Sequence, residues 1–188
     1  MESNIYFISG IDTDAGKSYC TAWYAKQLSL NGQRIITHKF IQTGNTCHSE
    51  DIDLHRRIIG TGYLPEDKEG LTMPEIFSYP CSPRPIDFNK IERSTQELGR
   101  RYDTVFIEGA GGLMVPLTEE YLTIDYIAEK KYPLIFVTSG KLGSINHTLL
   151  SLEAIKHRGI PLDTVLYNLY PTVEDKTIQN DTMQYIQK

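Results

Sequence analysis

The chain has 188 residues, of which 40% are hydrophobic and 23% are charged, so its length and composition fit a single globular domain over residues 1–188. Its formal net charge is −5 and no cluster of lysine and arginine stands out, so neither nucleic acid nor an anionic membrane is an expected partner. Residues 1–10 do not resemble a signal peptide, and no stretch approaches the roughly 20 apolar residues that span a bilayer. Three cysteines without a C-x-x-C pair favour free thiols in a reducing cytoplasm over disulfides or a zinc site.

The first half of the chain opens with a β-rich run at residues 4–10, followed by a helical pattern at residues 17–30. A second strand is predicted at residues 34–41. Residues 49–60 fit a short helix with an acidic first turn and a closing glycine. Residues 61–86 hold five prolines and few periodic signals, which indicates a long loop with one helical turn.

The second half continues the alternation of helical patterns and apolar strands. Further helices are predicted at residues 88–102, 122–131, 144–159 and 174–187, and further strands at residues 103–112, 132–140 and 162–170. The helix at residues 144–159 is expected to be strongly amphipathic. Continuous apolar strands that alternate with helices predict an α/β fold, a parallel sheet with helices on both faces.

Unusual residues gather where the predicted strands end. In a sheet of this kind the ligand lies at the carboxyl ends of the strands. Five of these ends carry glycine, polar or charged residues, at positions 10–18, 39–44, 108–112, 139–146 and 168. This clustering predicts a binding site at one edge of the sheet.

The sequence GIDTDAGKS, residues 10–18, has the character of a phosphate-binding loop with unusual spacing. Gly10 lies six positions before Gly16, and Ile11 stands where the strict pattern has glycine. A phosphate loop needs glycine for a curled backbone, a helix start, a lysine for the outer phosphates and a hydroxyl for magnesium. Gly16, Lys17 and Ser18 supply these between a strand and a helix, which favours a variant loop over a chance match.

Magnesium on a nucleotide prefers oxygen ligands, and two side chains are candidates beside the Ser18 hydroxyl. Glu108 ends a buried apolar strand and is followed by glycines, which indicates a functional carboxylate. Asp51 and Asp53 are weaker candidates, because acids are favoured in the first turn of any helix.

A second lysine, Lys39, ends the strand at residues 34–41 and is expected to face the same edge as Lys17. Two ammonium groups in one cavity would neutralise the charge that develops during phosphoryl transfer. His38 points the other way by strand alternation, and we interpret it as structural. The other histidines, at positions 48, 55, 147 and 157, show no metal-ligand spacing.

The motifs together resemble those of the dethiobiotin synthetase family. The segments that carry the resemblance are GIDTDAGKS, KFIQTG, SED, VFIEGAGGLMVPL and GKLGSINHTLLSLEAIKHRG, over about residues 5–170. The resemblance implies a P-loop NTPase-like fold and a modified loop of this longer spacing. It also implies an enzyme that uses ATP, Mg²⁺ and CO₂ or bicarbonate to convert 7,8-diaminopelargonic acid to dethiobiotin through a carbamate and a carbamic–phosphoric anhydride.

The resemblance further implies roles for individual positions. Lys17, Lys39 and Thr13 correspond to catalytic residues, Thr13 and Thr43 to hydroxyls that hold the carbamate, and Asn168 to an asparagine that contacts the purine. The implied magnesium ligands are Ser18, Asp51 and Glu108. The implied ATP-binding residues are Asp14, Ala15, Gly16, Lys17, Ser18, Tyr19, Asp51, Glu108, Gly109, Ala110, Gly111 and Asn168, with Gly112 beside them.

A helix start supplies the last implied subsite. Gly143, Ser144, Ile145 and Asn146 correspond to residues that bind the substrate carboxylate, and in the family this helix comes from the other subunit. A carboxylate subsite at a helix start is physically reasonable, because the free N–H groups there favour an anion. A homodimer with shared active sites is therefore implied.

Three features depart from the family pattern. Asp14 stands where glutamate is common, and Phe40 stands where proline is usual, so the loop before Thr43 is expected to be less rigid. Many members also continue with a G-x-I-P segment that contacts adenine. No such segment occurs before residue 188, which implies weak base selectivity or a truncated chain.

Other nucleotide-binding proteins remain as alternatives. Partitioning ATPases carry a lysine early in the loop, where Asp12, Thr13 and Asp14 stand here, and a cobyrinic acid amide synthetase needs a glutaminase domain for which no residues remain. A non-enzymatic switch would bind ATP without turnover, and an assay for diamine-dependent ADP release distinguishes it from a synthetase.

Overall fold

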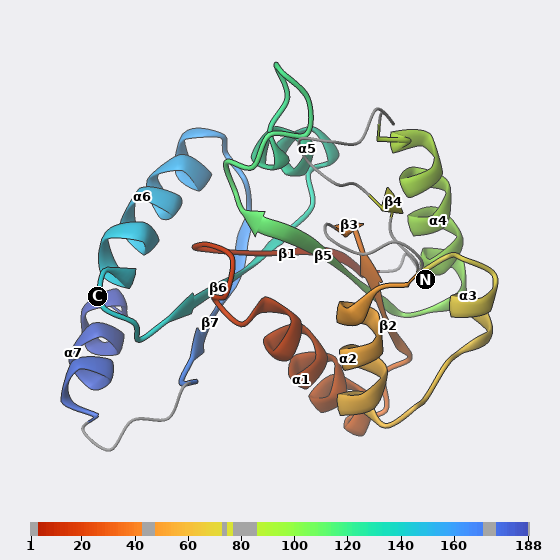
Figure 1. Cartoon of the computed structure of the whole chain (residues 1–188), viewed down its shortest axis with the longest axis horizontal. Coiled ribbons are helices and arrows are strands. Elements are labelled where there is room, and N and C mark those ends of the chain that lie inside the picture. Colours follow the sequence, from red (N-terminus) through yellow and green to blue (C-terminus); the bar gives the residue numbers. More distant parts are fainter. Residues whose placement is uncertain (1–3, 43–47, 73–74, 77–85, 171–175, 188) are drawn as a thin grey trace.

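The computed structural model describes residues 4–42, 48–72, 75–76, 86–170 and 176–187 (Figure 1). Thr43, Cys47 and Cys81 lie outside these ranges, so the prediction for Thr43 is not examined by the structure. Among the described helices, none is long and apolar enough to cross a membrane.

A five-stranded parallel sheet forms the centre of the molecule, as the alternating pattern predicts. Its strands stand in the order β2-β5-β1-β6-β7. Their bounds are Ile35–Lys39 for β2, Thr104–Gly112 for β5, Asn4–Gly10 for β1, Leu134–Ser139 for β6 and Leu162–Asn168 for β7. Because all five strands run the same way, their carboxyl ends meet at one edge.

Helices cover both faces of this sheet. On one face lie α4 (Phe88–Arg101), α5 (Thr123–Lys130) and α6 (Ser144–His157). On the other lie α1 (Lys17–Leu30) and α2 (Glu50–Ile59), whose position opposite α5 is visible in Figure 1. The short α3 (Pro65–Lys68) follows α2, and α7 (Thr177–Ile186) contacts α6.

Strand alternation divides the hydrophobic core into two layers. On β5, Val105 and Ile107 pack in the cluster under α4, α5 and α6, whereas Phe106 packs in the cluster under α1. On β6, Phe136 and Val137 are divided in the same way. Both layers are closed to solvent, because the central strands are buried on each side.

The prediction of one strand at residues 34–41 is wrong at Phe40. The chain leaves the main sheet after β2, and β3 (Ile41–Gln42) pairs with β4 (Glu75–Ile76) in a separate two-stranded sheet. The Phe40 N–H donates to the Glu108 carbonyl at 2.8 Å, a bond that proline could not make. Its buried ring lies 5.3 Å from the Phe7 ring and 4.6 Å from the Tyr126 ring, so Phe40 itself is anchored in the core.

Helix ends follow the expected chemistry, although one helix is less amphipathic than predicted. The Ser49 hydroxyl accepts the Ile52 N–H at the start of α2, and Gly60 closes this helix with a left-handed φ of 92°. On α6 the prediction of strong amphipathicity is wrong, because Leu149 and Leu150 are exposed. Leucines of this helix are divided between the core and its outer surface.

Candidate active site

A cavity of about 1270 Å³ lies at the carboxyl edge of the sheet. It brings together twelve of the predicted site residues: Thr13, Asp14, Gly16, Lys17, Ser18, Tyr19, Lys39, Asp51, Glu108, Ala110, Gly111 and Asn168. Of the others, Ala15 is the loop residue that is buried in the hydrophobic cluster under α1, and the Gly109 carbonyl accepts a hydrogen bond from the Lys39 ammonium at 3.2 Å. The strand ends therefore converge, as the topology requires, on one hollow.

Glycine is required at two points of the loop for different reasons. Gly16 stands at the start of α1 with φ 86°, and a Cβ there would lie 2.1 Å from Asn168 Nδ2. Gly10 ends β1 so close to β6 that a Cβ would lie 2.9 Å from the Val137 carbonyl oxygen. The loop is thus held against the ends of β6 and β7.

Asn168 fastens β7 to this loop. Its Nδ2 donates to the Ala15 carbonyl at 3.0 Å, and its Oδ1 accepts the Tyr170 N–H at 3.0 Å. Both ends of the amide are therefore used within the chain. The contact seen here is with the loop, and contact with a purine stays a prediction.

Three side-chain oxygens meet beside the start of α1. The Ser18 Oγ lies 2.6 Å from Asp51 Oδ1 and 2.7 Å from Glu108 Oε1. The hydroxyl has one proton, so it donates to one carboxylate at a time. Asp53 points elsewhere and accepts the Tyr63 hydroxyl at 2.6 Å, so the structure separates the two aspartates that the sequence left as candidates.

Lys39 joins the same cluster from the neighbouring strand. Lys39 and Glu108 are direct partners in the pairing of β2 with β5. The buried Nζ lies 2.8 Å from Glu108 Oε1 and 2.7 Å from Asp51 Oδ2. Burial alone would lower the pKa of Lys39, but the two carboxylates outweigh it, so its pKa lies above the ordinary value.

Lys17 reaches the cavity from the first turn of α1. Its Nζ donates to the Asp12 carbonyl at 2.7 Å, and the side chain is buried. Burial and the nearby Lys39 ammonium lower the pKa of Lys17, against the opposing effect of Glu108. The two lysines therefore face one shared hollow, as predicted from their places at the strand ends.

Sequence reasoning missed one buried partner of the cluster, His55. Its Nε2 lies 2.8 Å from Glu108 Oε2, and neither side chain is exposed. Burial alone would raise the pKa of Glu108, but Lys39 and His55 hold it well below the usual range. A signal was present, because His55 stands four residues after Asp51 and so shares its helix face.

The rest of the cavity wall was not assigned residue by residue from the sequence, although Lys141 lies in the strand end at positions 139–146 that was expected at this edge. This part of the wall includes Trp23, Leu54, Lys141, Leu169 and Tyr170. The Lys141 Nζ donates to the Asp14 carbonyl at 3.1 Å and adds a third ammonium to the loop. Their place in the cavity wall depends on which strands and helices are neighbours, and the sequence pattern does not give this arrangement.

The predicted substrate helix does not line this cavity. Gly143 begins α6 with φ 89°, Ser144 is buried, and Asn146 is exposed. None of the positions 143–146 belongs to the lining of the cavity in the same chain.

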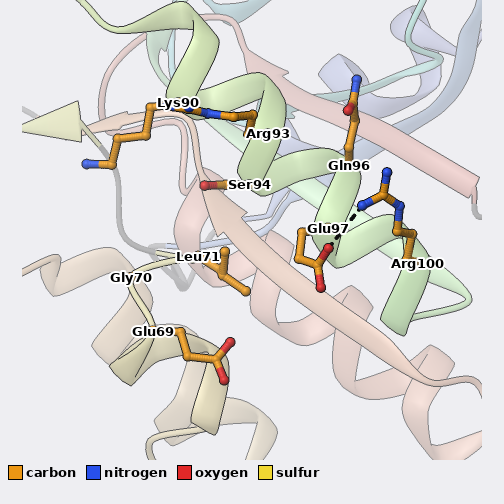
Figure 2. Close-up of a pocket in the computed structure, with 9 residues that line it drawn as sticks. All are labelled: Glu69, Gly70, Leu71, Lys90, Arg93, Ser94, Gln96, Glu97 and Arg100. Atoms are coloured by element: carbon orange, nitrogen blue, oxygen red, sulfur yellow. Dashed lines mark hydrogen bonds and ion pairs between the residues drawn. The ribbon is translucent and has the colours of Figure 1, made fainter.

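A second hollow of about 530 Å³ lies between α4 and the segment after α3 (Figure 2). Glu97 and Arg100 form an ion pair of 3.2 Å across one end of it. It holds no residue of the phosphate-loop cluster, so its charged side chains are separate from the site described above.

Fold and site together define a P-loop nucleotide-binding protein. Solved structures agree in fold alone: FlhF complexed with GMPPNP and Mg²⁺ has a TM-score of 0.58 at 16% identity, covering 100% of this chain and 63% of that one. A ParA family ATPase from Chlorobium tepidum has a TM-score of 0.53 at 16% identity, covering 98% and 80%.

Sequence comparisons narrow this class. A family model described as an AAA domain matches residues 4–188. ATP-dependent dethiobiotin synthetase BioD 2 of Pasteurella multocida is 47% identical over 99% of this chain and 91% of its own length. The enzyme of the same name from Haemophilus influenzae is 54% identical over 89% and 92%. The chain belongs to the dethiobiotin synthetase family.

Proposed function

We propose that the chain is a ligase that uses ATP to close the ureido ring of dethiobiotin, and that residues 1–188 act as one synthetase domain in the cytoplasm. Family membership supports the overall reaction. The observation that carries the site assignment is the meeting of Lys17, Lys39 and the Ser18–Asp51–Glu108 oxygen cluster in one cavity.

The oxygen cluster fits a magnesium ion. The Asp51 and Glu108 carboxylates each lie within hydrogen-bond distance of the Ser18 hydroxyl, and Mg²⁺ prefers such hard oxygen ligands and keeps some of its waters. Among the described residues no group of three or more His, Cys, Asp or Glu could hold a metal, so the proposed site rests on the Ser18 hydroxyl and two carboxylates alone. When bound, Mg²⁺ would neutralise and orient the phosphates of ATP.

The chain's own groups then act by placement and charge. One amine of diaminopelargonic acid combines with CO₂ and loses a proton to give a carbamate. A carbamate oxygen attacks the γ-phosphorus of ATP, which gives a carbamic–phosphoric anhydride and releases ADP. The second amine attacks the carbonyl carbon, forms the second C–N bond, and expels phosphate. Lys17 and Lys39 are placed to stabilise the negative oxygens throughout, and Thr13 at the cavity wall to hold the carbamate.

A homodimer with shared sites supplies the carboxylate subsite. Gly143, Ser144, Ile145 and Asn146 lie outside the chain's own cavity lining, which supports their use by the site of a second copy. Leu142, just before this helix, and Leu150, further along it, are 93% and 64% exposed. Burial of these side chains between two copies would remove apolar surface from water.

The reaction is tested with the whole chain, ATP, Mg²⁺, bicarbonate and diaminopelargonic acid. We expect ADP and a cyclic urea product in equal amounts, and little ADP when the diamine is left out. The cyclic product is measured by mass spectrometry.

A matched control uses a diamine of the same spacing that lacks the terminal carboxylate. It should need a higher concentration for half-maximal ADP release if the carboxylate subsite is real. ADP release at the same rate with and without diamine would contradict the synthetase assignment and favour a nucleotide switch.

A further inference from the structure

The two oxygens of the Glu108 carboxylate have different surroundings. Oε1 faces the cavity cluster, 2.7 Å from Ser18 Oγ and 2.8 Å from Lys39 Nζ. Oε2 faces away from these groups and lies 2.8 Å from His55 Nε2. The carboxylate is therefore held from both sides and cannot rotate without the loss of a buried hydrogen bond.

His55 is attached to the helix that carries the other carboxylate of the cluster. Asp51 and His55 are one helical turn apart on α2, so both project from the same face. Ile52, between them, is fully buried and packs α2 into the fold. A displacement of α2 would therefore move the Asp51 carboxylate and the His55 anchor of Glu108 together.

The ionised state of Glu108 determines which group donates the hydrogen bond between His55 and Glu108. A carboxylate that is ionised can only accept hydrogen bonds, so the proton in the contact stands on His55 Nε2. The Nδ1 of the same ring is buried and has no partner among the described residues. The imidazole thus uses one hydrogen bond, and that bond goes to Glu108.

We propose that His55 is a positioning residue of the metal site, which holds Oε2 of Glu108 so that Oε1 is presented to the cavity. The inference rests on the magnesium site of the proposed function. Side chains that orient a metal ligand from behind tune metal affinity by about 10- to 100-fold. His55 does not touch the reacting atoms and acts only through Glu108.

A purely structural role makes a different prediction. If His55 only fills space in the core, its replacement lowers thermal stability and leaves the effect of Mg²⁺ on nucleotide binding unchanged. The informative quantity is therefore a ratio, the dissociation constant of a nonhydrolysable ATP analogue without Mg²⁺ divided by that with Mg²⁺. It is measured by calorimetry and does not depend on turnover.

Three variants of the whole chain give the test, and a fourth is used if the first does not fold. In His55→Leu, which cannot donate, we expect the ratio to fall about tenfold or more. In His55→Gln the amide nitrogen can take the place of Nε2, so the ratio should stay near that of the wild type. Ile52→Val removes buried volume from the same helix without touching Glu108, and the ratio should not change.

An unchanged ratio in folded His55→Leu would overturn the proposal. If that variant does not fold, His55→Asn decides, because asparagine is too short to reach Glu108: the proposal requires a lower ratio in His55→Asn than in His55→Gln, and equal ratios would refute it. If the affinity of the wild-type chain for the analogue does not depend on Mg²⁺, the proposed metal site is refuted, and this inference is refuted with it. Failure of diamine-dependent ADP release in the wild type would instead refute the synthetase assignment alone.

Discussion

The starts of α1 and α6 are built alike but have different surroundings. Each helix follows a strand of the central sheet, and each begins after a glycine in a left-handed conformation, Gly16 with φ 86° and Gly143 with φ 89°. Around Gly16 the chain is closed, since a Cβ would meet Asn168 at 2.1 Å. Around Gly143 a Cβ would meet nothing within 4 Å.

This difference shows which of the two helix starts is enclosed by its own chain. Both helix starts offer free N–H groups, which favour a negative ligand. Only the start of α1 is joined by buried lysines from its own chain, Lys17 and Lys39. The start of α6 stays open, as the proposed subsite shared with a second copy requires.

Removal of a lysine beside the start of α1 should have the largest effect on turnover. In Lys39→Ala the carboxylates of Asp51 and Glu108 lose their shared ammonium, and stabilisation of negative oxygens is lost. We expect turnover to fall by about 10²- to 10³-fold, measured as diamine-dependent ADP release.

Lys130→Ala is the matched control, because Lys130 pairs with Glu92 on α4 and does not line the cavity. Its turnover should stay at the wild-type level. Near-normal turnover in a folded Lys39→Ala protein would show that Lys39 is not part of the site.

A change at the start of α6 should have a smaller effect, limited to the binding of one substrate. In Asn146→Ala we expect the KM for the diamine to rise about tenfold while the KM for ATP is unchanged, because one hydrogen bond to a carboxylate is lost. Steady-state kinetics with each substrate varied in turn measures both constants.

Mixing the two variants tests whether the sites are shared. In a mixed dimer of Lys39→Ala and Asn146→Ala chains, one site carries both defects and the other carries none. At low diamine concentration the mixture should exceed both parent variants. An activity equal to the mean of the parents would place Asn146 in the site of its own chain.

Glycine replacement affects stability and compares the two helix starts directly. Gly143→Ala should lose only the strain of a left-handed residue, about 1–2 kcal/mol in the free energy of unfolding. Gly16→Ala bears the same strain and must also displace Asn168, so its loss should be larger. Urea denaturation measures both, and equal losses would show that the closed surroundings of Gly16 carry no energetic cost.

Most of the sheet is predictable from sequence, because its strands are continuous apolar runs that end in glycine or charge. The second sheet is not, since β3 and β4 are two residues each and pair across a wide gap in sequence. Phe40 explains the error at the end of β2. An apolar residue there continues the pattern of a strand, but the chain leaves the sheet after Lys39 and the Phe40 ring packs in the core against Phe7 and Tyr126.

The candidate site shows the same limit. Lys39 and Glu108 were each placed at a strand end, and the shared cavity follows from that. Their direct pairing depends on β5 lying between β1 and β2, which no local pattern contains. His55 has no metal-ligand spacing in the sequence, and its partner is a carboxylate on a distant strand, so no local pattern identifies it.

The place of β5 between β2 and β1 has a consequence for biosynthesis. The strands that emerge first from the ribosome, β1 and β2, are not neighbours, and each pairs with β5, whose last residue is Gly112. The pairing that links β1 to β2 therefore cannot form until more than half of the polypeptide has been translated. Insertion of β5 then joins β1 to β2 and brings Glu108 beside Lys39, so the charged cluster depends on contacts between residues far apart in the sequence.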